Sequence, residues 1–157
     1  MFFPAVKTAP MPRESQLWQF FREGDFIDGY RVVAPYTPRR AAEIAMKFPA
    51  WVYGLLAIRQ IVMLPFGLKG KSKSADRMAI FPVTECSTDE MILGFDDKHL
   101  DFRIGIMARD GHIHCATWVH RHNWLGRAYL RAVMPFHILI TKQMLARVAR
   151  HAETGQP

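Results

Sequence analysis

The feature that most restricts the fold is the dipeptide Asp110-Gly111, which separates two stretches of alternating residues. LDFRIGIMAR precedes it and HIHCATWVHR follows it. Asp-Gly is typical of a two-residue turn in which both residues have positive φ, and such turns join antiparallel strands. The turn pairs Arg109 with His112, and the pairing continues outward in equal steps. Residues 100–121 are therefore predicted to form a β-hairpin of fixed register.

This register gives the hairpin two different faces, because successive side chains of a strand point to opposite sides. One face is apolar and carries Leu100, Phe102, Ile104, Ile106, Cys115, Thr117 and Val119. The other places Met107 opposite His114, Arg103 opposite Trp118, Asp101 opposite His120 and His99 opposite His122. We expect a helix to cover the apolar face and water to cover the polar one. On the polar face, Arg103 is predicted to lie over Trp118 and Asp101 to pair with His120.

Two further tight turns, Asp97-Lys98 and Thr88-Asp89, extend the sheet. They place Phe95 opposite Leu100, Leu93 opposite Phe102, Met91 opposite Ile104, Cys86 opposite Met91, Thr84 opposite Leu93 and Pro82 opposite Phe95, all on the apolar face. Cys86 and Cys115 then lie roughly 14 Å apart, at about 4.8 Å per strand, which excludes a disulfide. Free thiols are typical of a reducing compartment. The N-terminal segment is unlike a secretory signal because it contains Pro4, Pro10 and Pro12, so we expect a cytoplasmic protein.

The remaining elements follow from capping residues and apolar spacing. A strand over Asp28–Tyr36 precedes a helix that Thr37 caps and Pro38 begins, and a second helix runs from Ala50 to about Met63. Extended segments follow over Met78–Cys86, Met91–Phe95, His99–Arg109 and His112–His122. Asn123 caps a final helical segment, which Pro135 is expected to kink or divide into Trp124–Met134 and Pro135–His151.

This order predicts an α+β fold in which an antiparallel sheet of about five to six strands grips a long C-terminal helix. A two-helix insert follows the first strand. We expect an N-terminal arm over residues 1–24, a single domain over 25–152 and a tail over 153–157.

The chain is basic, with a formal net charge of +7. Its Lys and Arg residues are scattered rather than interleaved with aromatic residues, which does not favour nucleic-acid binding. The apolar run Trp51–Leu68 contains Arg59 and Gln60 and meets Pro65, so a buried amphipathic helix is favoured over a membrane span. Together with Lys69, Lys71 and Lys73, this helix keeps peripheral membrane contact open.

Histidines are concentrated in residues 109–123, which hold four of the seven. Asp96, His99 and His122 form one row across the predicted sheet, and Asp101 and His120 form the next. Such a set could bind zinc, but side chains on an exposed sheet face usually diverge. A solvated polar face is therefore favoured, and neither a metal nor another cofactor is predicted.

Four stretches carry a family resemblance: GFDDKHLDFRIGI, the strand ending in VHRHN, LGRAYLRAVMPFHILI and DFIDGYRVV. They resemble the bacterial domain-of-unknown-function family DUF2867 over about Asp25–Arg150, most specifically over Gly94–Ile140. The resemblance implies no reaction and no catalytic residues. That family is similar to domains fused behind NAD(P)-binding domains, but the glycine-rich nucleotide-binding fingerprint does not occur here, so no dehydrogenase activity is expected.

The element order is also similar to the START/polyketide-cyclase-like helix-grip fold. That resemblance implies a hydrophobic ligand held between the sheet and the C-terminal helix. The favoured function is therefore binding of an apolar or lipid-like small molecule. The predicted wall consists of Trp51, Tyr53, Leu55, Thr84, Phe102, Ile104, Thr117, Val119, Phe136, His137 and Ile140. For most of these positions, simple core packing is the alternative role.

Two other functions stay open. An enzyme of cyclase or hydrolase type would use His137, Glu85, or Asp101 with His120, although no nucleophile sits in a recognised motif. Alternatively, an interaction protein would use the basic loop at a membrane surface, or the His, Trp and Arg strip as a homodimer interface.

Overall fold

The computed structural model describes residues 3, 5–63 and 76–155, with the side chains of the second helix described as far as Ile58. The elements in chain order are β1 (Lys7–Thr8), the 3-10 helix η1 (Gln16–Gln19), β2 (Phe26–Val33), α1 (Pro38–Ala45), α2 (Ala50–Met63), β3 (Arg77–Met78), β4 (Phe81–Cys86), β5 (Glu90–Asp96), β6 (Leu100–Arg109), β7 (His112–Arg121) and α3 (Trp124–Thr154).

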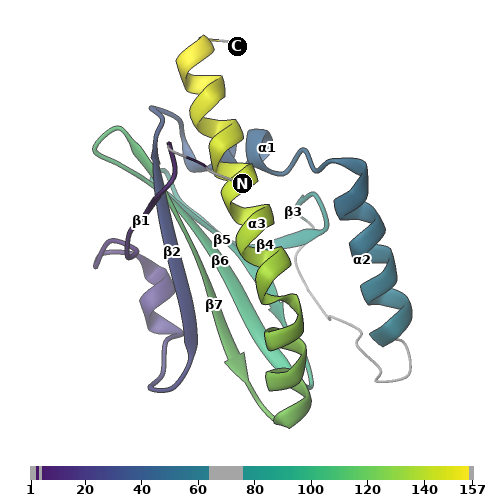
Figure 1. The fold of residues 1–157 in the computed structure, drawn as a ribbon. Helices are drawn as coiled ribbons and strands as arrows, with labels where there is room; N and C mark the ends of the chain where they lie inside the picture. The colour runs from purple at the N-terminus through teal and green to yellow at the C-terminus, as the bar shows by residue number, and fades with distance from the viewer. Residues whose placement is uncertain (1–2, 4, 64–75, 156–157) are drawn as a thin grey trace.

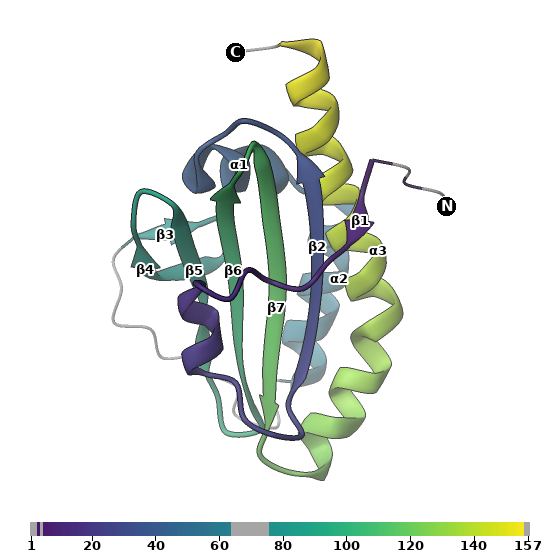
Figure 2. The same cartoon turned by 90° about the vertical axis from the view of Figure 1, so that its left-hand side faces the viewer.

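The described strands form one antiparallel seven-stranded sheet in the order β1-β2-β7-β6-β5-β4-β3. All three α-helices lie on one side of this sheet (Figure 1). The N-terminal segment crosses the opposite side over β2, β7 and β6 (Figure 2). The predicted α+β helix-grip architecture is confirmed. The sheet has more strands than the expected five to six because β1 and β3, each two residues long, pair at its edges.

The β6–β7 hairpin has the predicted register, from Arg109 opposite His112 to Asp101 opposite His120. Its turn is of the predicted kind, since φ is 50° at Asp110 and 72° at Gly111. The β5–β6 connection is longer than predicted, so Phe95 pairs with Phe102 instead of Leu100. A shift of two residues keeps every side chain on its predicted face.

The β4–β5 pair departs from the prediction at one point. Cys86 lies opposite Met91 as predicted, but a bulge between Val83 and Glu85 places Val83, not Thr84, opposite Leu93. Val83 is therefore buried and Thr84 is exposed. The extra residue explains the difference, because a bulge reverses the alternation of side chains beyond it.

The helices pack on one face of the sheet, with α3 over β2 and β7 and α1 over β5 and β6. The largest buried cluster lies between them; it includes Val32, Ile44, Met91, Leu93, Ile113 and Val148.

Helix α3 begins at the predicted cap, where the Asn123 side chain accepts a hydrogen bond from Gly126 N at 3.0 Å. Of the two alternatives expected at Pro135, a kink or a division, the division is wrong, because α3 is a single helix through this residue. The axis of α3 bends part-way along (Figure 2). Buried residues on both sides of Pro135, such as Leu130 and Leu145, pack into the core. This tertiary packing outweighs the helix-breaking tendency of one proline.

The opposite face of the sheet is not the solvated surface that the sequence predicted. Gly29, Ala116 and Gly105 lie opposite one another on β2, β7 and β6, and the N-terminal segment lies on this row of small residues. A Cβ atom on Gly29 would lie 2.4 Å from Ala9 O, and one on Gly105 would lie 3.0 Å from Met11 Cε. The missing side chains therefore allow a backbone to approach the sheet closely.

This N-terminal segment builds a second apolar cluster, in which Met11 and Leu17 pack with Met107, Ala116 and Trp118. A buried carboxylate holds it in place: Glu90 accepts hydrogen bonds from the Ser15 hydroxyl and, at 2.8 Å, from Gln16 N. Residues 5–24 of the predicted arm are thus part of the folded structure, and they cover the face of the sheet opposite the helices where they cross it.

Helix α2 is the least buried of the three helices along its described side chains. Val52 is the only one of them that is buried; Trp51, Tyr53 and Ile58 are exposed. None of the described helices is by itself long and apolar enough to span a membrane. By length and composition alone, α1 and residues Ala50–Ile58 could do so as a pair bent by 86°. The predicted basic loop with Lys69, Lys71 and Lys73 lies outside the described residues.

Candidate functional site

Three phenylalanines lie next to one another on the helix-side face of β4, β5 and β6. Phe95 and Phe102 are register partners on β5 and β6, and their ring centroids lie 4.6 Å apart in an edge-to-face arrangement. Phe81 of β4 meets Phe102 at 5.6 Å. All three side chains are only partly buried. We call Phe81, Phe95 and Phe102 the phenylalanine cluster.

The interface between the sheet and α3 is nearly filled by side chains. Its described cavity has a volume of about 20 Å³ and is lined by apolar groups and one threonine: Ala41, Ala45, Ile104, Ile106, Ile113, Cys115, Thr141, Met144, Leu145 and Val148. A space of this size holds about one water molecule. A ligand of ordinary size therefore does not fit into this cavity unless side chains move.

One polar pair joins α3 to the sheet. The His137 Nε2 and the Asp28 Oδ2 atoms lie 3.0 Å apart, and both side chains are largely buried. Asp28 Oδ1 accepts a hydrogen bond from Thr117 N at 3.2 Å, and the Phe26 ring packs edge-on against His137. The carboxylate fixes the imidazole orientation, as it does for a histidine that accepts or delivers protons. His137 thus lies on the helix side, as the sequence predicted.

Two groups beside Asp28 titrate outside the neutral range. Burial, and secondarily the Asp28 carboxylate, raises the pKa of the Cys115 thiol to about 12. The same two causes, in the same order, raise the pKa of Tyr30. The Lys142 ammonium lies 5.7 Å from the Tyr30 ring centroid. Cys115 is therefore a protonated, unreactive thiol at neutral pH.

The residues of the predicted ligand wall do not all meet. Thr117 and Val119 are buried and Phe102 and Ile104 partly buried on the helix side of the sheet, while Leu55, His137 and Ile140 are partly buried on α2 and α3. Trp51, Tyr53 and Phe136 are exposed to 41%, 48% and 47%. Thr84 is exposed because of the bulge, and its hydroxyl donates to Ile92 O at 3.1 Å.

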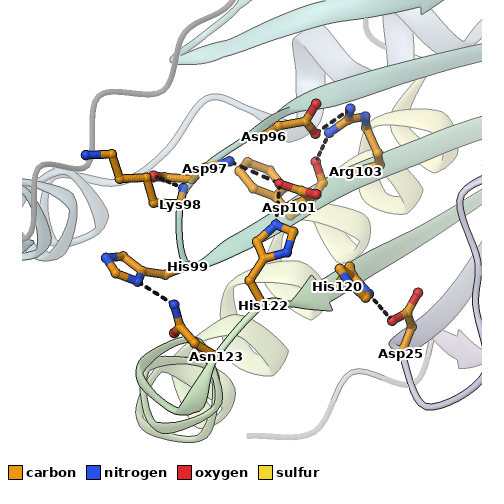
Figure 3. A network of polar contacts seen from close by, with 11 residues as sticks. Asp25, Asp96, Asp97, Lys98, His99, Asp101, Arg103, His120, His122 and Asn123 are labelled. Atoms are coloured by element: carbon orange, nitrogen blue, oxygen red, sulfur yellow. Dashed lines mark hydrogen bonds and ion pairs between the residues drawn. The ribbon is translucent and has the colours of Figure 1, made fainter.

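The histidines near the start of α3 belong to separate pairs rather than to one centre (Figure 3). Asp96 pairs with Arg103 at 2.7 Å, His122 with Asp101 at 3.0 Å, and His99 with the Asn123 amide at 2.9 Å. In the described part of the chain no group of three or more His, Cys, Asp or Glu side chains converges on a metal position. The described structure therefore does not bring Asp96, His99 and His122 together as the alternative metal site would require.

His120 is held by a residue that the sequence did not suggest. Its Nδ1 lies 2.6 Å from Asp25 Oδ1, although its strand partner is Asp101. Asp25 also accepts hydrogen bonds from Trp118 Nε1 and Arg22 N, both at 2.9 Å. Burial raises the pKa of Asp25, but these hydrogen bonds outweigh it and hold the pKa below its ordinary value. The predicted Asp101–His120 pair is wrong, because Asp25 reaches His120 from the segment before β2.

The other predictions for this face are corrected in the same way. Arg103 lies over the Phe20 ring, 4.9 Å from its centroid, instead of over Trp118. Trp118 is buried beneath Phe20. Glu85 accepts from Gln19 Nε2 at 3.1 Å and lines an open groove of about 290 Å³ beside η1, so it lies across the sheet from His137. The enzyme candidates therefore do not form one catalytic centre.

The sequence profile of a family described as "Protein of unknown function (DUF2867)" matches residues 20–144. This chain belongs to the DUF2867 family. The matched region runs from the end of η1 into the second half of α3, so it includes the phenylalanine cluster and the Asp28–His137 pair of this DUF2867 protein. Comparisons with curated proteins and with solved structures gave no match.

Proposed function

We propose that this DUF2867 protein binds an apolar small molecule, such as a single-chain lipid, on the helix side of its sheet. The observation that carries the proposal is the phenylalanine cluster, whose three rings stack edge-to-face and yet remain partly exposed. Partly exposed aromatic groups that adjoin one another are typical of ligand-binding and interaction surfaces.

The arrangement of the helices supports this position. Helix α1 covers β5 and β6, and α3 covers β2 and β7. Phe102 packs against a buried cluster that contains Val119 of β7 and Leu130 of α3. A ligand that lies on the phenylalanine cluster would therefore have α3 as a side wall, with α2 on the same side of the sheet (Figure 1).

The Asp28–His137 pair supplies polar groups at the same layer. In a mostly apolar site, one or two fixed polar groups orient the ligand. His137 is held by Asp28 and packs against Phe26, which shares a row with Val119 and Phe102 across the sheet. We assign this pair to orientation of a polar ligand end, and we propose no reaction.

Fluorescence titration with dansyl-labelled undecanoic acid tests the proposal. We expect saturable binding with one probe per chain. Replacement of a buried phenylalanine contact should remove about 1.5–3 kcal/mol. Phe95→Ser should therefore weaken binding roughly ten- to hundredfold.

The matched control is Val33→Ser, which replaces an exposed apolar residue near the end of β2, away from the cluster. It should leave the affinity unchanged, and thermal melts should show that both variants are folded. Equal affinity of Phe95→Ser and the unchanged chain, or an equal loss in Val33→Ser, would contradict the proposed site.

A further inference from the structure

The exposed side of α2 is apolar over two helical turns. Ala50, Trp51, Tyr53, Gly54, Ala57 and Ile58 are exposed, whereas Val52 is buried and Leu55 and Leu56 are partly buried. At 100° per residue the exposed residues share an arc of roughly 160°. This arc carries no charged side chain. A surface helix of a globular protein normally directs polar residues outward, whereas residues 50–58 of α2 are apolar on the exposed side as well as on the buried side.

The chain around α2 has one sign of charge. Between Ile44 and Ala75 the sequence contains Lys47, Arg59, Lys69, Lys71 and Lys73 and no Asp or Glu. Lys47 is exposed three residues before α2 begins. Arg150 of α3 is also exposed, and its charge contributes to the lowered pKa of Arg147, after burial. The cations at the N-terminal end of α2 therefore gather from α3 and from the α1–α2 connection.

The start of α2 is fixed to the body of the protein. Arg147 donates hydrogen bonds to the carbonyl oxygens of Ala45, at 3.1 Å, and of Lys47. The Phe48 ring packs edge-on against Tyr53 at 5.9 Å, and Val52 is 2% exposed. A surface that bound the exposed arc would therefore be connected to the domain through the anchored start of α2.

We propose that the exposed arc of α2 docks on an anionic membrane surface. Trp and Tyr are the residues that prefer the interface between lipid and water, and an apolar arc flanked by cations is what such a surface binds. Each Lys or Arg near an anionic bilayer contributes to attraction, which salt screens. The proposal does not depend on the ligand site, because it uses the outward side of α2.

Vesicle flotation with the full chain tests this. We expect flotation with vesicles of phosphatidylcholine mixed with phosphatidylglycerol, and little with phosphatidylcholine alone. Ile58→Asp should weaken the apparent affinity about tenfold or more, through lost apolar burial and added repulsion. Lys47→Gln should weaken it about fivefold. High salt should release the protein.

The matched control is Val33→Asp, which makes the same kind of change at an exposed apolar residue of β2. It should alter the affinity by about threefold or less, because its charge lies away from the docked arc. The proposal is overturned by equal flotation with both vesicle types, by no flotation, or by equal effects of Ile58→Asp and Val33→Asp. Circular dichroism of each variant separates loss of docking from loss of fold.

Discussion

At the scale of single residues, burial determines how the two cysteines react. Both are free, as the sequence predicted. Cys115 is buried in β7, where burial and Asp28 raise its pKa to about 12. Cys86 was expected on the apolar face, but it ends β4 and is exposed. Strand alternation indicates the face of the sheet to which a side chain points. It does not indicate whether the helices on that face extend far enough to bury the side chain.

This difference predicts the course of thiol labelling. With Ellman's reagent at pH 8, one thiol per native chain should react quickly and the second only after denaturation. At this pH the thiolate fraction of Cys115 is roughly a thousandfold below that of an ordinary thiol, and the reagent also lacks access. Cys86→Ser should abolish the fast phase. Two fast thiols in the native chain would contradict the burial of Cys115.

Asp25 makes a prediction about pH. Its pKa is lowered in the folded chain, so its stabilising contribution is present above the ordinary pKa of 3.8 and is lost as pH falls through the folded value. At pH 7, Asp25→Asn should lower the free energy of unfolding by about 1.5–3 kcal/mol. Urea unfolding at pH 7 and below pH 3 measures this, and the difference between the two chains should shrink at the lower pH. An unchanged difference would contradict the assigned role of Asp25.

The pairings of polar side chains were the hardest feature to predict from the sequence. The sequence predicted His137 as part of the ligand wall but did not indicate its partner. Its partner Asp28 lies 109 residues away in the sequence. The pair can be predicted only once the pairing of β2 with β7 is known. The pairing of Asp25 with His120 was not predicted for the same reason, because Asp25 lies outside the hairpin and far from His120 in the sequence.

At the scale of elements, the N-terminal segment shows what a fixed register could have revealed. The hairpin register alone places Ala116 opposite Gly105, and β2 adds Gly29 to the row. A row of small residues across three strands indicates that a backbone lies on the sheet. The sequence prediction rested instead on Arg103, Trp118 and the histidines, which indicated a polar, solvated face.

Gly29→Ala tests this contact. The added Cβ would lie 2.4 Å from Ala9 O, so the N-terminal segment must shift, at a cost of about 1–3 kcal/mol. Hydrogen exchange over residues 5–20 should accelerate. Gly54→Ala is the matched control, since nothing lies within 4 Å of its added Cβ. It should leave exchange in this segment unchanged. Unchanged exchange in Gly29→Ala would contradict the close packing of the segment.

At the scale of the whole molecule, local signals predicted most of the architecture. The Asp110-Gly111 turn, the Thr37 and Asn123 caps and the alternation of four strands together specified an antiparallel sheet with helices on one side. The continuity of α3 through Pro135 and the bulge at Thr84 depend on packing between distant elements, so local patterns could not predict them. The same limit applies to the ligand wall, where exposure of Trp51 and Tyr53 follows from the position of α2.

The central claim is that the helix-side face at the phenylalanine cluster binds an apolar ligand. Photo-crosslinking with a diazirine-labelled fatty acid, followed by peptide mapping, tests it most directly, because only groups that touch the probe become labelled. At saturation we expect adducts on β4, β5 and β6 at Phe81, Phe95 or Phe102, and on the first half of α3. Adducts confined to the N-terminal segment around Met11 and Leu17, or none at saturation, would contradict it.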